Sequence, residues 1–474
     1  MTFQEVNDFI PKILPINVDW KKIEQVMNYA KETNQWVLCF IIGTKPCINK
    51  FFGAVKYSSE KKLPVMVIDS NQHYDATLTK GLEEFGYLDK ISVNLNIRGD
   101  LNQKSGELFF KLKWLASALK KKWPNITAIP VINGDVIVAA IAPAAWMFAR
   151  GEKGVNMEAG MRSMSPSSFR KLKSKELTKK GFEDFVQGQF NEKWELLPIE
   201  PFPEQWDTYV SSKGCQFNFA PLNINKQNLL REGYPEKYVP LANSGVVIDA
   251  WKFLKNKKPE QSIFELYPQL EKDSWIRVDI HRKENLNPVR FKSLIGGIKK
   301  LVDKGHNINL IGMNATKHAL KNNKLTSVVE KLKEKKNFLY TDLWPEFSQV
   351  REFYKSEHNL FPLTDSGGVQ EDMNYWRKPC LTARFSTDRP ETGMESKSNL
   401  LVPPISPELV YSVVHNAVND EILLNNMANA PYLYGEGFGK TFANKMKEYM
   451  KNEKPFTWTH EELGLWKDKH NTDF

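Results

Sequence analysis

Cysteine is scarce in this sequence, and its placement excludes two kinds of stabilising site. The four cysteines (Cys39, Cys47, Cys215 and Cys380) lie far apart, without a CxxC pair or a Cys/His set at zinc spacing. Neither a disulfide framework nor a structural metal is therefore predicted. We expect the four thiols to be reduced and mostly buried.

Long hydrophobic runs are also missing. The apolar run from Val136 to Ala149 covers about two-thirds of the roughly 20 residues that a membrane-spanning helix needs, so it predicts a buried helix instead. The first residues have no apolar core followed by small residues, which argues against a secretory signal. We expect a cytoplasmic protein without membrane insertion.

No GxxxxGK[ST] motif follows a predicted strand, which makes nucleotide hydrolysis of the P-loop type unexpected.

The composition is that of a folded protein with several domains. Of the 474 residues, 41% are hydrophobic and 26% are charged, which excludes a disordered or collagen-like chain. The net charge of +10 favours an anionic partner, but the cations are spread too evenly to form a nucleic-acid stripe. A phosphorylated small molecule is the expected ligand, and nucleic acid is not.

Strand, polar loop and helix recur along the chain as a unit. Apolar runs at 36–42, 63–69 and 126–133 each end at a polar loop, which is typical of buried parallel strands. A second series begins near residues 244–249 and includes 274–280, 307–311 and 360–364. Such units predict doubly wound sheets with ligand-binding groups at the carboxyl ends of their strands.

The expected fold is therefore α/β of the GT-B type, with two doubly wound Rossmann-like domains facing across a cleft. We expect an N-terminal domain over residues 1–243, a C-terminal ligand-binding domain over 244–435, and a helical segment, 436–474, that packs back on the first domain. The polar, basic stretch at about 163–199 has no strand signal and is predicted to be an insertion, either a solvated surface excursion or a mobile flap over an active site.

Two loops of the first series carry residues that folding does not demand. The turn 43–46 has a glycine and the cation Lys45, which suits a phosphate but is too short to be specific. Asp135 and Glu158 follow neighbouring predicted strands, and two carboxylates brought together are suited to general acid and base work on a sugar carbon. The alternative for each carboxylate alone is a helix N-cap or a loop salt bridge.

Two loops of the second series have the same character. His281 and Arg282 follow a strand and could neutralise a diphosphate and protonate a leaving oxygen, although a lone histidine is often structural. The turn Ser366-Gly367-Gly368 precedes a predicted helix, so its amides could hold phosphate oxygens, and the acidic pair at 371–372 could accept ribose hydroxyls. The alternative is an ordinary turn that caps a helix.

Taken together and in this order, the loops resemble the UDP-N-acetylglucosamine 2-epimerase family over residues 36 to 440. The matching segments are GTKP (43–46), NQHYD (71–75), NGD (133–135), MEAGMRS (157–163), PFPE (201–204), FAPLNINKQNLLREG (219–233), VVIDA (246–250), IHRKEN (280–285), TDSGGVQED (364–372) and TDRPE (387–391).

This resemblance implies a GT-B enzyme, usually dimeric, that interconverts UDP-GlcNAc and UDP-ManNAc without a metal or nicotinamide cofactor and supplies polysaccharide biosynthesis. UDP leaves by anti elimination to give a 2-acetamidoglucal and then adds back after protonation on the other face. The family's catalytic residues fall on Asp135, Glu158, Glu204 and His281. Its UDP-binding residues fall on Ser366, Gly367, Gly368, Asp372 and Arg389, and Lys45 stands where the family usually has arginine.

Some departures from the family pattern leave other activities open. Asn156 replaces a histidine two residues before Glu158, the long insertion directly precedes the segment of Glu204, and a histidine of the effector site is absent near Met313. A hydrolysing enzyme that releases ManNAc and UDP is one alternative. A glycosyltransferase that uses a UDP-sugar donor and holds its acceptor with the insertion and the N-terminal extension is another.

Overall fold

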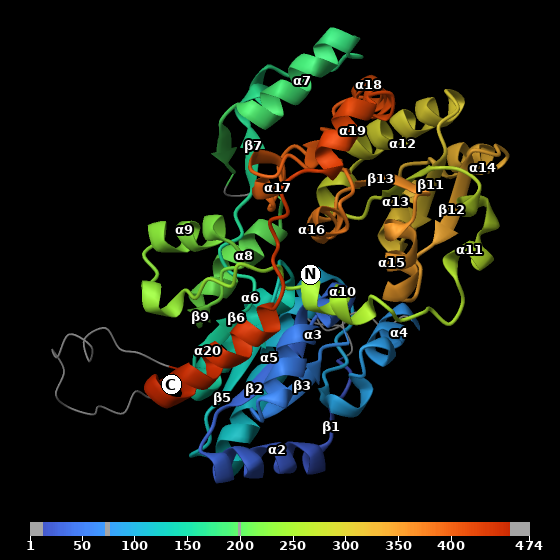
Figure 1. The fold of residues 1–474 in the computed structure, drawn as a ribbon. Helices are drawn as coiled ribbons and strands as arrows, with labels where there is room; N and C mark the ends of the chain where they lie inside the picture. Colours follow the sequence, from blue (N-terminus) through green and yellow to red (C-terminus); the bar gives the residue numbers. More distant parts are fainter. Residues whose placement is uncertain (1–12, 72–75, 198–200, 456–474) are drawn as a thin grey trace, which may run out of the picture. The chain divides into compact units, whose positions relative to one another are not determined.

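The computed structural model describes residues 13–71, 76–197 and 201–455 (Figure 1). It divides into two compact units, and each is described by itself. Unit 1 contains the residues up to 160, residues 206–250 and those from 436 onward, and unit 2 contains 161–205 and 251–435. Among the described residues, no helix is both long and apolar enough to cross a membrane.

The elements of unit 1 alternate between strands and helices for most of its length. They are β1 (Asn17–Val18), α2 (Trp20–Thr33), β2 (Val37–Ile42), α3 (Lys45–Glu60), β3 (Val65–Asp69), α4 (Ala76–Glu84), β4 (Ile91–Asn94), α5 (Leu101–Lys122), β5 (Ala128–Ile132), α6 (Ile137–Arg150), β6 (Gly154–Asn156), β9 (Cys215–Asn218), α9 (Asn223–Arg231) and α20 (Phe438–Asn452), with the 3-10 turns η1 (Leu88–Lys90) and η3 (Glu236–Tyr238). Helices α8 (Glu204–Lys213) and α10 (Ile248–Leu254) each cross the boundary between the units.

Within the described residues, unit 1 has a seven-stranded sheet in the order β1-β4-β3-β2-β5-β6-β9. Every pairing in it is parallel except that of the short edge strand β1 with β4. After the edge strand β1, the chain enters the middle of the sheet at β2, moves out to β4, and then returns to add β5, β6 and β9 on the other side. This is the strand order of a doubly wound fold, as the sequence predicts.

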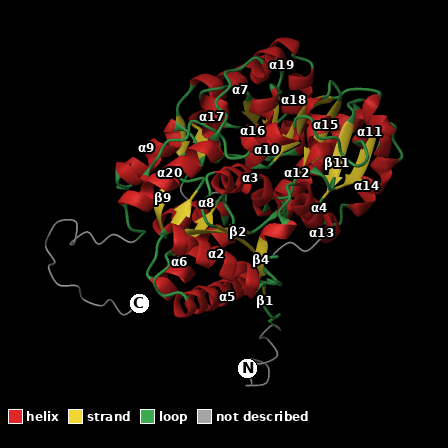
Figure 2. Ribbon diagram, turned by 60° about the horizontal axis from the view of Figure 1, so that its bottom comes forward, coloured by secondary structure: helices red, strands yellow, loops and turns green. Residues whose placement is uncertain are grey.

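The period of two along β2 explains why helices cover both faces of this sheet (Figures 1 and 2). Val37, Cys39 and Ile41 pack in one cluster with α2, α5 and α6. The ring of Phe40 points to the other face, where its centroid lies 5.3 Å from that of Phe51 on α3 and 5.9 Å from that of Phe442 on α20. Helices α20 and α3, from opposite ends of the chain, therefore lie side by side in unit 1.

Unit 2 repeats the strand and helix alternation. Its elements are β7 (Met164–Pro166), α7 (Lys179–Asn191), β8 (Trp194–Leu196), α11 (Ile263–Leu266), β10 (Trp275–Asp279), α12 (Pro288–Asp303), β11 (Ile308–Gly312), α13 (Asn314–Asn322), α14 (Thr326–Lys333), β12 (Phe338–Asp342), α15 (Phe347–Lys355), β13 (Asn359–Thr364), α16 (Gly367–Trp376), β14 (Cys380–Thr382), α17 (Pro390–Met394), β15 (Asn399–Leu401), α18 (Pro407–Val418) and α19 (Glu421–Ala428), with the 3-10 turns η2 (Ser167–Lys171), η4 (Pro268–Glu271) and η5 (Lys283–Asn285).

The main sheet of unit 2, as far as the chain is described, has six parallel strands in the order β12-β11-β10-β13-β14-β15. Its first strand, β10, is again central, so both units share one doubly wound plan. Ile276 and Val278 face a cluster with α12 and α18, whereas Trp275 packs with Phe353 and other residues on the opposite face. Unit 2 is thus also covered by helices on both sides.

The expected insertion has secondary structure of its own and groups with unit 2. Residues 163–197 form the β7–β8 hairpin and helix α7, and the whole segment belongs to unit 2 and not to the N-terminal domain. Phe182 and Phe185 on α7 are buried in the core cluster of unit 2, and Figure 1 shows α7 beside α17 and α18. Helix α7 is therefore packed against the core of unit 2, whereas residues 170–180, which lead into it, are mostly exposed. The last two residues of the expected insertion lie outside the described residues.

A second expectation also needs correction. The apolar residues 244–249 were expected to open the second series with a strand, but they form no strand, and helix α10 begins at Ile248. Unit 2 takes over only from Trp251. The apolar run is nevertheless buried, and Ile248 and Trp251 on the short helix α10 are 0% and 2% exposed. By contrast, the buried helix predicted at 136–149 is confirmed as α6.

Candidate active site

The predicted site residues cluster at the point of each sheet where the strand order reverses. In unit 1 this point lies between β2 and β5, and the loops after these strands carry Lys45 and Asp135. In unit 2 it lies between β10 and β13, whose following loops carry His281 and Ser366. Ligands of doubly wound sheets bind outside the carboxyl ends of the strands at such points, so the topology favours a functional interpretation of these loops.

Lys45 is the first residue of helix α3, directly after the turn that leaves β2. Thr44 is the N-cap, and Pro46 occupies the first helical turn, where its missing N–H costs no hydrogen bond. The free amides of a helix N-terminus attract anions, and a half-buried lysine beside them adds a full positive charge. The arrangement suits a phosphate group.

Sequence reasoning missed Lys50, one and a half turns further along α3. Its Nζ lies 2.6 Å from Oε2 of Glu158, and both residues are buried. Gly134, directly before Asp135, packs against this ion pair: a Cβ there would lie 3.3 Å from both charged atoms, and its φ of +76° also favours glycine. The structure thus brings the Asp135 loop, Glu158 and Lys50 together.

Two buried asparagines precede these carboxylates by two residues each, Asn156 before Glu158 and Asn133 before Asp135. The Asn156 side chain accepts from the backbone N–H of Glu158 at 3.0 Å and donates to the hydroxyls of Ser211 and Ser212 at 3.1 and 3.3 Å. It therefore positions the Glu158 backbone in the place where the family has a histidine. Asn133 is only 2% exposed, and the described residues give neither end of its amide a hydrogen-bond partner. Such a group requires water or a ligand to offset the cost of its burial.

In unit 2, the buried carboxylate of Asp365 holds the loop after β10. It accepts from the backbone N–H groups of His281 and Arg282 at 3.0 to 3.1 Å and from the side chain of Asn285 at 3.1 Å. The Nδ1 of His281 also lies 3.2 Å from an Asp365 oxygen, while the imidazole remains about one-third exposed. Asp365 thus fixes the loop that carries His281, and the imidazole of His281 remains accessible to solvent.

The next residue, Arg282, pairs with Glu204 at the start of α8. Its Nη1 lies 2.8 Å from Oε1 of Glu204, whose second oxygen has no hydrogen-bond partner among the described residues. Burial raises the pKa of Glu284, and Arg282 and Arg384 partly oppose that rise. The structure thus places a cation, Arg282, against a carboxylate, Glu204, that has one oxygen left for a further partner.

The turn before α16 has an open side and a closed side. A Cβ on Gly367 would meet the Asp388 carboxylate at 2.7 Å, whereas one on Gly368 would meet nothing within 4 Å. Ser366 is the N-cap, and the free amides of the first helical turn follow it. The helix N-terminus therefore has space beside Gly368 for a ligand such as a phosphate.

The two acidic residues of α16, Glu371 and Asp372, contact different partners. Glu371 lies against the guanidinium of Arg389, which also contacts Asp388 at 2.7 Å, and Arg389 is only 2% exposed. Asp372 accepts instead from the indole N–H of Trp251 at 2.5 Å. The expected phosphate ligand Arg389 is thus held among carboxylates, and a direct contact with phosphate stays a prediction.

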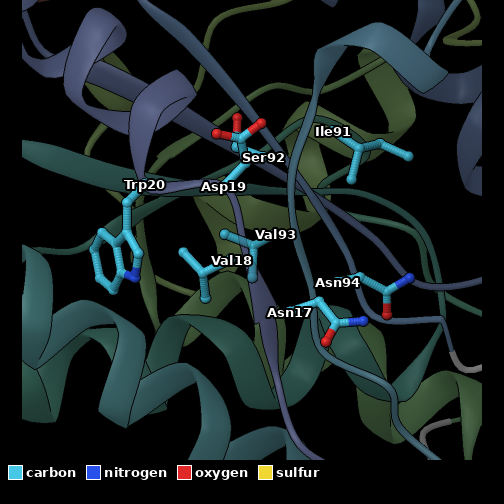
Figure 3. A pocket seen from close by; sticks show the side chains of 8 residues that line it. All are labelled: Asn17, Val18, Asp19, Trp20, Ile91, Ser92, Val93 and Asn94. Atoms are coloured by element: carbon cyan, nitrogen blue, oxygen red, sulfur yellow. The ribbon is translucent and has the colours of Figure 1, made fainter.

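A pocket of about 520 Å³ lies elsewhere in unit 1, and its lining contains none of the predicted residues. It is formed by β1, β4 and the start of α2 (Figure 3). Its carboxylate, Asp19, is the N-cap of α2 and accepts from the backbone N–H of Lys22 at 3.0 Å. We interpret this pocket as a feature of the sheet edge. No group of three or more potential metal ligands is found among the described residues, and residues 72–75 of the NQHYD segment lie outside them.

The comparisons with known proteins agree with one another. The family model described as UDP-N-acetylglucosamine 2-epimerase matches residues 198–444. The UDP-N-acetylglucosamine 2-epimerase of Methanocaldococcus jannaschii is 25% identical over 405 residues, which cover 84% of this chain and 95% of that protein. The enzyme of the same name from Salmonella borreze is 32% identical over 246 residues, 50% of this chain and 62% of that one.

Solved structures extend the likeness to the fold. The crystal structure of the Methanocaldococcus jannaschii UDP-GlcNAc 2-epimerase in complex with UDP-GlcNAc and UDP has a TM-score of 0.66 at 24% identity and covers 87% of this chain and 99% of that one. The Neisseria meningitidis enzyme bound to UDP-GlcNAc also has a TM-score of 0.66, at 21% identity, over 88% and 100% of the two chains. The expected GT-B fold is confirmed, and the chain belongs to the UDP-N-acetylglucosamine 2-epimerase family.

Proposed function

We propose that this protein is an isomerase that interconverts UDP-GlcNAc and UDP-ManNAc, or a close relative of this pair. One observation supports the proposal most strongly: acid–base residues and a phosphate-binding turn lie at the switch points of the two sheets. Unit 1 thus offers a base for the sugar, and unit 2 offers a helix N-terminus for the diphosphate. The relatives named for UDP-GlcNAc 2-epimerase activity support the same reaction.

The UDP group is assigned to unit 2. The amides of Ser366, Gly367 and Gly368 would hold phosphate oxygens, and Asp372 would accept from the ribose. Arg282, beside the exposed His281, would balance the charge of the diphosphate. Lys45 would add a second cation. Arg389 would act mainly by fixing Glu371 and Asp388, given its burial between them.

The proton chemistry is assigned to the carboxylates. Of Asp135 and Glu158, one would remove the proton from C2 while the C1–O bond breaks and UDP leaves with the bonding electrons. The other would then give a proton to the opposite face of C2 while a phosphate oxygen of UDP forms the bond to C1 again. His281 would protonate or hydrogen-bond the departing phosphate oxygen, and Glu204 would share protons through its second oxygen. The Lys50 Nζ, 2.6 Å from Oε2 of Glu158, supports this assignment because it holds the carboxylate in a fixed position beside the Asp135 loop.

A hydrolysing enzyme is the second candidate, favoured by Asn156. This side chain is committed to Glu158 and two serines, and an amide cannot relay a proton as an imidazole does. If proton return is slower as a result, water has more time to intercept the glucal intermediate. The products would then be free ManNAc and UDP.

The remaining expectations belong to the same proposal. The four cysteines are buried and unpaired, which supports a reducing compartment such as the cytoplasm. A homodimer is expected from the resemblance, and the exposed aromatic residues of unit 1, discussed below, offer it a surface. Supply of polysaccharide biosynthesis follows from the same family pattern.

The test is proton NMR of the purified protein with UDP-GlcNAc in deuterated water. Deuterium at C2 together with UDP-ManNAc signals is the expected result, and free ManNAc with UDP would identify the hydrolysing reaction. Turnover that starts only when a sugar acceptor is added would indicate a glycosyltransferase instead. Asp135→Asn should lower the exchange rate by about a thousandfold without loss of folding, as expected when a catalytic acid or base is removed. Unchanged exchange in that variant would contradict the proposed mechanism.

A further inference from the structure

We propose that Trp251 is a positioning residue that fixes the Asp372 carboxylate and thereby sets the preference for a ribose over a deoxyribose nucleotide. The inference rests on the proposed function, because it assigns a nucleoside diphosphate to the N-terminus of α16. It adds a residue from outside the strand-end loops, on the short helix α10.

The contact is short and protected from water. The Trp251 Nε1 lies 2.5 Å from Oδ1 of Asp372, and the two residues are 2% and 8% exposed. A hydrogen bond from a neutral donor to a carboxylate is charge-assisted, so it is stronger than a bond between neutral groups. Its loss in a buried place leaves the carboxylate with one fewer donor and more rotational freedom.

The indole itself is held firmly. Its ring packs edge-on against Phe347 of α15 and Trp376 of α16, at centroid distances of 6.4 and 5.8 Å. Arg351, also on α15, donates from Nη1 to the backbone carbonyls of Leu254 and Lys255 at the end of α10. Helix α10 is therefore anchored at its carboxyl end, which keeps the Trp251 donor directed at Asp372.

The two acidic residues of α16 consequently have different roles. Glu371 lies against the Arg389 guanidinium, which balances its charge. Trp251 holds Oδ1 of Asp372 with a neutral N–H donor, which itself adds no positive charge to the carboxylate. Asp372 lies one turn and a half into the helix that begins with the Ser-Gly-Gly turn, at the distance from the phosphates where a ribose would lie.

The test compares the binding of UDP, 2′-deoxy-UDP and 3′-deoxy-UDP by isothermal titration calorimetry. We expect the wild-type protein to bind UDP about tenfold more tightly than at least one deoxy analogue, the effect of one hydrogen bond to a charged group. In Trp251→Phe this ratio should fall to about threefold or less. In the matched control Trp376→Phe it should be unchanged, because that ring packs against Trp251 but its N–H has no hydrogen-bond partner among the described residues.

The ratio is informative even if a variant is partly unfolded, because an unfolded fraction lowers the stoichiometry for all three ligands alike. A wild-type ratio in Trp251→Phe would overturn the positioning role and leave the proposed function intact. A wild-type protein that binds UDP without preference over either analogue would also overturn it. Failure of the wild-type protein to bind UDP at all would overturn the proposed function and this inference together.

Discussion

Lys50 shows how a functional residue can escape a search of loops. It lies inside α3, on a helix whose side chains are mostly buried, and reaches Glu158 at the end of a different strand. A lysine among Cys47, Ile48, Asn49, Phe51 and Phe52 was a readable signal, because an amphipathic lysine rarely lies within a buried stretch without a partner. The identity of that partner depends on how the strands are ordered, which residue types alone do not specify.

The first prediction concerns this ion pair. Lys50→Met leaves the Glu158 carboxylate buried without its close cation and should lower the free energy of unfolding by about 3 kcal/mol. The double variant Lys50→Met/Glu158→Gln should recover most of this loss, because no buried charge is then left uncompensated. Urea denaturation at neutral pH measures both. If the effects of the two substitutions simply add, the pair does not stabilise the fold as the geometry indicates.

For the other predicted site residues, too, the position along the chain could be predicted but the contacting partner could not. The positions of Asp135, Glu158, His281 and Ser366 at strand ends followed from the pattern of apolar runs. Their partners did not: neither Asp365 behind His281 nor Glu204 beside Arg282 is specified by spacing along the chain, since about 80 residues separate each pair. Arg389 is the clearest example, because its burial among carboxylates changes its proposed role.

At the scale of elements, helix α7 carried a signal that its basic composition concealed. Phe182, Phe185, Val186 and Gln189 follow the i, i+3, i+4, i+7 spacing of one helix face, and all four are buried. The side chain of Gln189 also pairs with the edge strand β15: its amide donates to the Leu401 carbonyl and accepts from the Leu401 N–H, both at 2.9 Å. The insertion therefore covers a sheet edge that would otherwise be open.

The second prediction tests this cover. Gln189→Ala should lower the free energy of unfolding by about 1–3 kcal/mol, because it leaves a buried N–H and a buried C=O of β15 without partners. Gln187→Ala, on the exposed face of the same helix, is the matched control and should change stability by less than about 0.5 kcal/mol. Chemical denaturation followed by circular dichroism compares them. Equal losses in the two variants would argue that α7 contributes only through its helical propensity.

A pair of histidines between α12 and α18 gives the third prediction. Nε2 of His306 lies 2.8 Å from Nδ1 of His415, and Tyr411 stacks on the second ring. Burial lowers the pKa of both histidines, Lys304 lowers them further, and Glu176 partly opposes this at His415. Below about pH 6.5 the unfolded chain therefore binds more protons than the folded one, and stability falls as the pH falls through the folded pKa values.

The variant His415→Asn should show the contribution of this pair. It removes one titrating ring and the repulsion between two protonated rings, so the drop in Tm between pH 7.5 and 5.5 should be smaller than in the wild-type protein. Carboxyl groups with raised pKa values, such as Glu391 at about 7, are common to both proteins and cancel in the comparison. An identical drop in Tm in the two proteins would contradict the assigned role of the pair.

At the scale of the whole molecule, the sequence predicted repeated strand and helix units, and it predicted that both units have the same doubly wound topology. Both follow from the long apolar runs, which are typical of parallel strands buried on both faces. The boundaries between the units could not be predicted. Residues 161–205 join unit 2 because Phe182, Phe185 and the β7–β8 hairpin find their partners there, whereas residues from 436 onward join unit 1. Such assignments depend on long-range packing and not on any local signal.

The fourth prediction concerns assembly. Phe110 and Trp114, one turn apart on α5, are 70% and 47% exposed, and the Trp114 ring lies 6.3 Å from that of Trp20, which is 37% exposed, so these residues form one aromatic patch in unit 1. An exposed apolar cluster of this kind is typical of an association surface, and a second copy of the chain is the partner expected from the family pattern. Light scattering should give a mass of about twice 54.7 kDa for the wild-type protein.

Phe110→Glu/Trp114→Glu should shift that mass to a single chain, because two charges cannot be buried in an interface without partners. The control is Ile422→Glu, which places a charge at a solitary apolar residue of unit 2 that is 76% exposed, and it should leave the mass unchanged. A dimer that persists in the double variant would assign the contact to a different surface. A wild-type protein that runs as a single chain would contradict the expected homodimer, and the patch would then have to serve another partner.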